Sequence, residues 1–297
     1  MRPELAHNII TFDGTLHPAP PKSQIPPVML ISSITHCNQQ LSTRIQEQAF
    51  SETIVTSIRH MVNVKSITLH DFGWLGTPYE NLVRDAISST VSLSSLTTLI
   101  IGGQDFPKSG GHENHSSQLS LLLRSQPLLE SLELGSGEWD LQNCILRSDV
   151  PRLSRLVARP HEARFLVPGR PITSLSITSI FTVPGPDEWK MLAASAVPLT
   201  FLTLDDTIDP EVLESALRSV ATHFKDVQRL LIYGAAYHAF PLLVEGLPSF
   251  PSLRTLRLMA WDIDTEGKKK IDSRRLHAIT CIRSVNPQFE NLEIEEW

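Results

Sequence analysis

The amino-acid sequence predicts an α/β fold in which short parallel strands and helices alternate along the chain. Three observations lead to this prediction. The octet Pro-x-Leu-x-x-Leu-x-Leu occurs at 127–134 and again at 251–258. Looser copies of the same apolar spacing lie before, between and after these segments, and the residues separating the copies have the periodicity of amphipathic helices. A repeated strand–helix unit is typical of a solenoid, in which each unit packs against its neighbours.

The spacing of the copies indicates the class of repeat. We take the middle apolar residue of each copy as its marker. The markers are about 28 residues apart on average, near the upper end of the 20–29-residue period of leucine-rich repeats. The sequence therefore predicts a leucine-rich-repeat solenoid with a curved parallel sheet and helices on its convex side. The markers are Ile67, Leu99, Leu132, Leu156, Leu175, Leu202, Leu230, Leu256 and Leu292.

Each copy should begin with a strand, because apolar and polar residues alternate in its x-Leu-x-Leu half and neighbouring side chains on a strand point to opposite faces. We expect the leucines to pack beneath the helices. The clearest helix is predicted over 209–224, where Asp209 suits the N-cap and Pro210 the first helical position. An apolar stripe with helical spacing predicts a helix at 41–62, and weaker helices are expected at 79–91, 116–126, 186–197 and 271–285.

The chain is expected to have two parts. Residues 1–60 would form an N-terminal capping or first-repeat region with a proline-rich loop at 18–27, and residues 61–297 an array of about nine units. A doubly wound α/β enzyme is the alternative fold. It is disfavoured because its strands, covered on both faces, form continuous apolar runs, whereas the strands predicted here alternate.

Composition and charge narrow the environment and the partners. The net charge of −6 excludes a generic nucleic-acid binder, which needs a basic surplus. Three widely separated cysteines, Cys37, Cys144 and Cys281, fit no disulfide framework and favour the reducing cytoplasm or nucleus. No signal peptide and no apolar run long enough to span a bilayer is present in the sequence, so no membrane partner is expected.

No local motif indicates catalysis, a cofactor or a metal. The sequence contains no G-x-S-x-G, H-E-x-x-H, Walker A or G-x-G-x-x-G pattern. His112 and His115 lie among glycines and serines, which favours an exposed loop over a metal site. The basic cluster at 268–275 is interpreted as an exposed loop, with a nuclear signal or a contact to an acidic partner as alternatives. We therefore expect a protein that is not an enzyme and has no cofactor.

The Pro-led octets, the irregular repeat length and the segments 156–158 and 165–172 together resemble the leucine-rich-repeat region of fungal, basidiomycete-type F-box-like proteins. The resemblance covers roughly residues 60–297. It implies an intracellular, non-catalytic protein whose repeats select substrates for a cullin-based ubiquitin ligase. The ligase adaptor would be a partner only if an F-box lies upstream. Residues 2–5 resemble the opening of an F-box, but 9–12 and the proline-rich segment do not continue one, so the F-box itself is not found.

The concave face of the sheet is the candidate binding site, because solenoids use such faces to bind proteins. The predicted function is a non-catalytic protein–protein interaction scaffold, and the resemblance implies that it is the substrate-recognition arm of an F-box-type ubiquitin ligase. The alternatives are a repeat-only adaptor outside any ligase and a hydrolase-like α/β enzyme with dispersed catalytic residues. The candidate partner-binding residues lie between or beside the strand leucines: Thr68, His70, Glu133, Thr203, Asp205, Tyr233, Arg257, Met259 and Glu293.

Overall fold

The computed structural model divides into two compact units, Met1–Leu153 and Ser154–Trp297, and each is described by itself. The predicted boundary at residue 60 lies outside the described residues. Among the residues that are described, no helix is long and apolar enough to cross a membrane. The structure describes residues 9–13, 31–32, 65–69, 95–101, 119–135, 139, 141–142, 144–178, 184–205, 210–233, 250–260, 279–280, 282–284 and 286–296.

The first unit contains a parallel sheet whose strands lie in the order β2, β1, β3, β4, β5. Three of these strands carry predicted markers as their second residues. Ile67 is paired with Leu99, and Leu99 with Leu132, so the predicted repeat register is confirmed. The strands are β1 Ile9–Asp13, β2 Ile31–Ser32, β3 Ser66–Leu69, β4 Thr98–Ile101 and β5 Ser131–Leu134.

Strands β1 and β2 were not among the predicted repeats. They belong to the region expected to be a cap or first repeat, and β1 pairs in parallel with both β2 and β3. Neither strand follows the apolar spacing by which the later strands were located, or the Pro-x-Leu-x-x-Leu pattern that precedes β5, β6 (Arg155–Ala158) and β10 (Thr255–Ala260). Without that pattern, the sequence offered no repeat spacing with which to place them.

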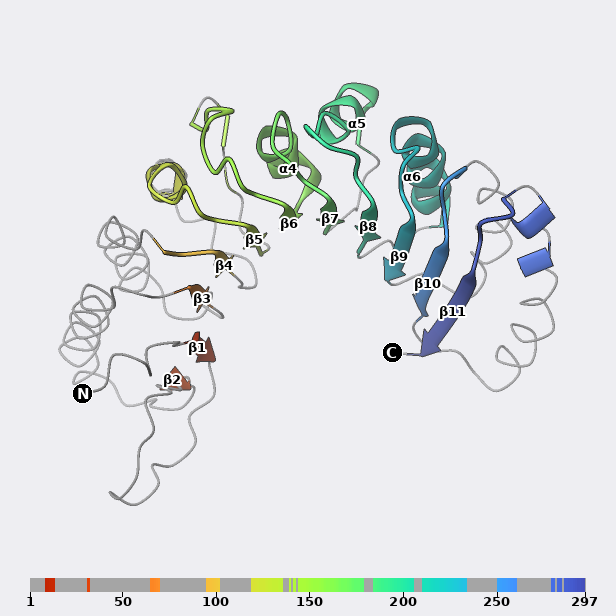
Figure 1. Ribbon diagram of the computed structural model, residues 1–297, viewed down its shortest axis with the longest axis horizontal. Coiled ribbons are helices and arrows are strands. Elements are labelled where there is room, and N and C mark those ends of the chain that lie inside the picture. Colours follow the sequence, from red (N-terminus) through yellow and green to blue (C-terminus); the bar gives the residue numbers. More distant parts are fainter. Residues whose placement is uncertain are drawn as a thin grey trace, which may run out of the picture. The chain divides into compact units, whose positions relative to one another are not determined.

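The second unit contains six parallel strands in chain order, from β6 to β11. The second residue of every one is a predicted marker, as expected for a leucine-rich-repeat solenoid. Figure 1 shows these strands following an arc with helices on its outer side. The strands are β6 Arg155–Ala158, β7 Ser174–Ile177, β8 Phe201–Leu204, β9 Arg229–Tyr233, β10 Thr255–Ala260 and β11 Asn291–Glu296.

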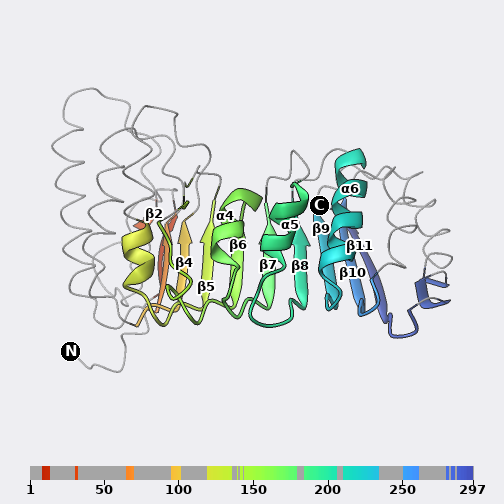
Figure 2. The same cartoon turned by 90° about the horizontal axis from the view of Figure 1, so that it is seen from above.

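The helices described in the second unit cover one face of its sheet (Figure 2). This arrangement contradicts the doubly wound alternative, in which helices cover both faces. Helix α6 spans Pro210–His223, as predicted, and α5 spans Pro186–Leu192, shorter than the expected 186–197. The described parts of two other predicted segments are helical at 119–124, 279–280 and 282–284. The predicted helices at 41–62 and 79–91 lie outside the described residues.

Helix α4, Pro160–Leu166, was not predicted, because a helix of two turns is too short to show a clear apolar stripe. Its start nevertheless follows a rule shared with α5. Each helix has proline at its first position and a glutamate two residues later. The Glu162 carboxylate accepts the N–H of Arg159 at 3.0 Å, and the Glu188 carboxylate accepts that of Gly185 at 3.1 Å.

The Pro-led octet has a structural cause in the turn before each strand. The N–H of Leu129 donates to the carbonyl of Gln126, and the N–H of Leu253 donates to that of Phe250. Proline occupies the second position of both four-residue turns, where its restricted φ is favoured. The two N–H groups after each turn then donate to a single carbonyl of the preceding repeat, Thr97 in one case and Gln228 in the other. The octet therefore both makes the turn and joins consecutive repeats.

The core of the second unit lies between the sheet and the helices. The strand markers Leu156, Leu175, Leu202 and Leu230 are fully or almost fully buried there. Between α5 and the end of α6, the rings of Trp189 and Phe224 meet edge to face, with centroids 6.1 Å apart and planes at 82°. Leucines from the strands and aromatic side chains from the helices thus close one side of the sheet and leave the other side open.

Candidate functional site

The open face of the second unit is the side of strands β6–β11 opposite α4, α5 and α6. It corresponds to the concave face predicted from the sequence (Figure 1). Side chains alternate along each strand, so the residues flanking the buried leucines form rows that run across the strands. The row nearest the strand starts contains Arg155, Ser174, Phe201, Arg229, Thr255 and Asn291. The next row contains Val157, Ser176, Thr203, Leu231, Arg257 and Glu293.

Six of the predicted partner-binding residues belong to this face, on the four consecutive strands β8–β11. Thr203 and Arg257 both pair in register with Leu231, Arg257 also pairs with Glu293, and Met259 pairs with Tyr233. Asp205 directly follows β8. Whether a partner contacts these residues stays a prediction.

The open face has an apolar floor and a more exposed rim. Thr203 is 4% exposed, Met259 8% and Leu231 9%, although all three point away from the helices. By contrast, Phe201 and Tyr233 are only half-buried. The low exposure of these three residues distinguishes the floor from a sheet that simply faces water.

The remaining predicted residues belong to the first unit. Thr68 on β3 and Glu133 on β5 lie in register with Ile100 on the intervening strand. Thr68 is 7% exposed and Glu133 is half-buried. His70 lies outside the described residues. Two of these three residues, Thr68 and Glu133, therefore lie in one row on either side of β4.

An ion pair occupies one end of the open face. Arg257 Nε lies 3.8 Å from a carboxylate oxygen of Glu293, and both side chains are about two-fifths exposed. Asn291 on the same strand donates to the other oxygen of Glu293 at 2.8 Å. The charge of Arg257 is therefore partly balanced before any partner binds.

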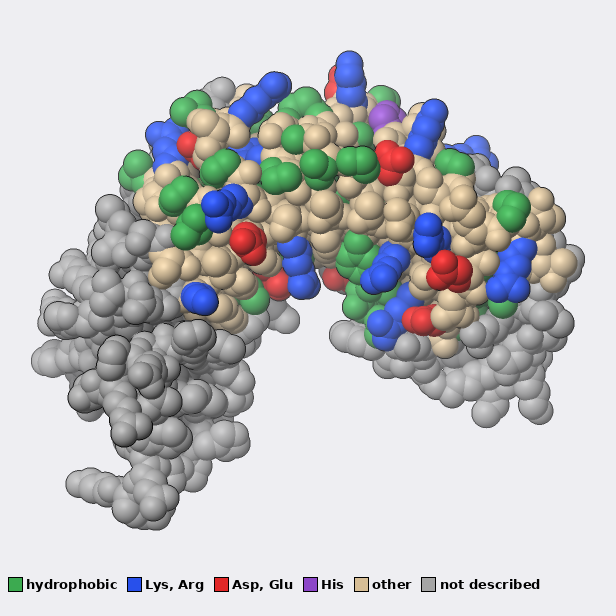
Figure 3. Space-filling view, viewed as in Figure 1, with side chains coloured by type: hydrophobic (Ala, Val, Ile, Leu, Met, Phe, Trp, Pro, Cys, Tyr) green, Lys and Arg blue, Asp and Glu red, His purple; other side chains and the backbone are tan. Residues whose placement is uncertain are grey.

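The row nearest the strand starts was missed by the sequence analysis. Arg155 and Arg229 are exposed, and neither makes an ion pair with any described residue. Phe201 lies between them, next to Arg229 in register. The signal was available in the alternation, since the residue before the first strand leucine shares a face with the residue after it. Figure 3 shows basic, acidic and hydrophobic side chains close together around β8–β10.

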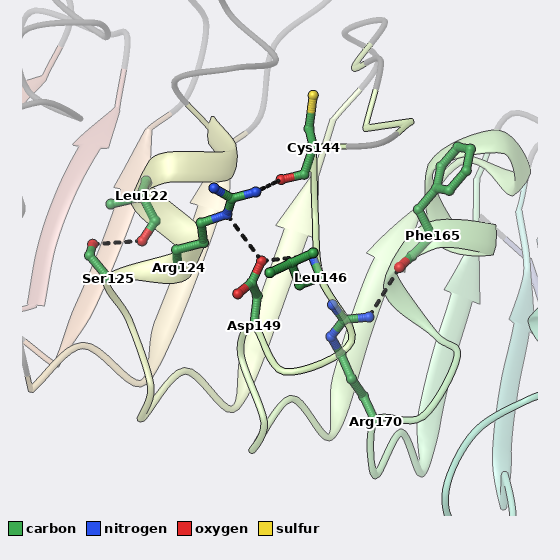
Figure 4. A network of polar contacts seen from close by, with 8 residues as sticks. All are labelled: Leu122, Arg124, Ser125, Cys144, Leu146, Asp149, Phe165 and Arg170. Carbon is green, nitrogen blue, oxygen red and sulfur yellow. Dashed lines mark hydrogen bonds and ion pairs between the residues drawn. The ribbon is translucent and has the colours of Figure 1, made fainter.

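Two arginines elsewhere, the exposed Arg124 and the buried Arg170, have structural partners (Figure 4). In the first unit, Arg124 donates to the carbonyl of Cys144 at 2.7 Å and to the carboxylate of Asp149 at 3.3 Å. In the second unit, Arg170 is 1% exposed and donates to the carbonyls of Phe165 and Leu166, which end α4. These contacts close loops and helix ends, which accounts for the arginines without a ligand.

No group of three or more metal-ligating side chains occurs among the described residues. Cys144 is half-buried, and Cys37, Cys281, His112, His115 and the basic cluster at 268–275 lie outside the described residues. The open face presents apolar surface, aromatic rings and charged groups, which are the groups that protein interfaces use.

No protein-family model and no curated protein gives a significant match to the chain. Among solved structures, it is similar to the leucine-rich repeat-containing protein LegL7 from Legionella pneumophila, with 15% identity, coverage of 82% of this chain and 87% of that one, and a TM-score of 0.45. A Bacteroides fragilis protein gives 16% identity, 86% and 72% coverage, and a TM-score of 0.41. The strand register, rather than these distant similarities, identifies each unit as an α/β leucine-rich-repeat solenoid.

Proposed function

We propose that the protein is a non-catalytic interaction scaffold that binds another protein on the open face of its second unit. The observation that carries this proposal is the composition of that face, with an apolar floor beneath half-exposed Phe201 and Tyr233 and a rim of charged side chains. Protein interfaces share this anatomy, with an apolar centre, aromatic and arginine side chains, and a polar edge.

Affinity purification of the full chain, followed by direct binding measurements with the recovered partner, tests the proposal. Tyr233→Ala combined with Arg257→Ala should weaken binding by about 2 kcal/mol or more, as expected for tyrosine and arginine side chains that a partner desolvates. Arg218→Ala is the matched control, because Arg218 is exposed on α6 and pairs with Glu214 on the same helix. If the control weakens binding and the open-face double variant does not, the partner binds elsewhere and the proposal is wrong.

The narrower proposal is that the scaffold is the substrate-recognition arm of an F-box-type ubiquitin ligase. Its support is the sequence resemblance to fungal F-box-like proteins. Purification of the native gene product should then recover the ligase adaptor and cullin together with the substrate. Recovery of a partner without adaptor or cullin would favour a repeat-only adaptor and contradict the ligase role.

A further inference from the structure

Two unpaired cations share one row of the open face. Arg155 on β6 and Arg229 on β9 both precede the first buried leucine of their strands. Ser174 and Phe201 separate them, and each step across the row is an in-register pair. Both arginines are exposed, and within the described part of the chain neither has an ion-pair partner. An arginine held on a strand without a carboxylate nearby is available to a ligand.

The spacing of the two cations matches an extended peptide. Three strand-to-strand steps separate them, which amounts to about 14 Å at the backbone. An extended chain rises about 3.4 Å per residue, so four residues also cover about 14 Å. Side chains alternate along such a chain, and residues i, i+2 and i+4 therefore point to the same side. A peptide crossing the strands could place acidic groups at i and i+4 opposite both arginines.

The side chains between the arginines define the middle of the peptide. Residue i+2 would lie about 7 Å from either acid, over the boundary between Ser174 and Phe201. Ser174 is small, and the half-buried ring of Phe201 offers apolar surface beside it. An aliphatic side chain such as leucine suits this position, since its contact with the ring removes apolar area from water.

The charges elsewhere on this face leave the row of arginines as the site for an anion. Arg257 is engaged by Glu293 at the far end, where Glu295 on β11 pairs in register with Met259, and Asp205 follows the opposite end of β8. Arg155 and Arg229 thus supply positive charge on a chain whose net charge is −6. Such a local cationic row attracts an acidic segment, whereas the whole chain repels a long polyanion.

We infer that, given the proposed function, the partner presents an extended segment with acidic side chains at i and i+4 and an aliphatic side chain at i+2, which lies across β6–β9. The acidic groups pair with Arg155 and Arg229, and the aliphatic group packs between Ser174 and Phe201. Charge pairing sets the register of the segment, and the apolar contact selects the central residue.

The test uses the full chain and a fluorescent nine-residue peptide of glycine and serine with aspartate at its third and seventh positions and leucine at its fifth. A second peptide of the same composition exchanges the leucine and the seventh-position aspartate. Fluorescence anisotropy at low ionic strength should show the first peptide binding about three- to tenfold more tightly, the range expected for well-placed surface charge pairs. Equal affinities would overturn the inference.

Variants of the chain sharpen the test. Arg155→Gln and Arg229→Gln should each weaken binding of the first peptide by about three- to fivefold, as for an exposed ion pair. Lys225→Gln is the matched control, because it removes the same charge from an exposed position in the turn before β9. Arg229→Glu should also weaken binding of the first peptide. Replacing the seventh-position aspartate of that peptide by lysine should restore binding to this variant. The inference would be overturned if Lys225→Gln lowered the peptide affinity as much as Arg229→Gln does, or if the lysine peptide did not restore binding to Arg229→Glu. Either result would indicate nonspecific attraction.

Other outcomes separate the possible ligands and the two proposals. In one outcome, a single-stranded oligonucleotide or phosphatidylserine vesicles compete for the same arginines while the two peptides bind equally well. That result would mean that the row binds polyanions in general and not the proposed protein segment. If the natural partner is lost with the Tyr233 and Arg257 double variant while the peptides are not distinguished, the scaffold function stands and this inference fails. If the peptides behave as expected but the natural partner ignores every open-face variant, the scaffold proposal fails.

Discussion

The two faces of the second unit's sheet are built from the same strands and differ in how uniform they are. On the helix-covered face, every strand from β6 to β10 presents leucine, isoleucine or alanine, and these side chains are almost completely buried. On the open face, arginine, serine, phenylalanine, threonine and leucine succeed one another from strand to strand. The covered face needs the same shape in each repeat because each helix packs against it. The open face carries no such constraint, so its chemistry is free to differ at each strand.

The largest effect is expected on the covered face. Leu256→Ala should lower the free energy of unfolding by about 2–5 kcal/mol, because it leaves a cavity in a packed core. Its neighbour Arg257 points to the open face, and Arg257→Ala should cost no more than about 1 kcal/mol, as for an exposed ion pair. Urea denaturation of both variants measures the difference. Similar losses would mean that the two faces do not differ in the way the register indicates.

Removing a buried polar side chain should lower the free energy of unfolding slightly less than removing a core leucine. Asn286 is 3% exposed, and its amide donates to the carbonyls of Phe250 at 3.1 Å and Leu253 at 2.7 Å. Asn286→Ala should destabilise the protein by about 1–3 kcal/mol, because two buried carbonyls lose a donor. Chemical denaturation of the variant beside Gln288→Ala, whose side chain is exposed, checks the value. A change below the control would show that these carbonyls are satisfied otherwise.

The ion pair between Arg257 and Glu293 on the open face should contribute less to the free energy of unfolding. A double-mutant cycle with Arg257→Ala and Glu293→Ala should give a coupling free energy of about 0.2–1 kcal/mol, because both side chains are well exposed to water. The coupling should fall as salt is added, since exposed charges are screened. A coupling that is unchanged in high salt would indicate a desolvated pair and a more deeply covered open face.

The smallest effect is expected on the outer surface of α6. Arg218 and Glu214 are spaced i and i+4 on that helix and form an ion pair. Removing it with Arg218→Ala should cost about 0.3–0.5 kcal/mol, the usual range for such helical pairs. Thermal or urea unfolding gives the value. A loss as large as that of Asn286→Ala would disqualify Arg218→Ala as a neutral control in the binding experiments.

Local patterns predicted the strands better than the helices. The apolar markers located every strand from β3 to β11, because the apolar spacing before each strand and the alternation within it are both short-range features. Helix α4 escaped prediction because its two turns show no stripe, although Pro160 and Glu162 mark its start. Strands β1 and β2 escaped because they lack the turn pattern and are defined by their pairing with each other and with β3.

The sequence by itself determined which residues of each strand face the helices and which face away, because that division follows from a period of two along the chain. Only the tertiary structure decided what the outward residues do. It covers Thr203 and Met259, pairs Arg257 with a glutamate 36 positions later, and leaves Arg155 and Arg229 without an ion pair in the described part of the chain. The markers predicted which residues lie in register, but burial and ion pairing also depend on the conformation and length of the surrounding side chains. A local pattern does not contain that information.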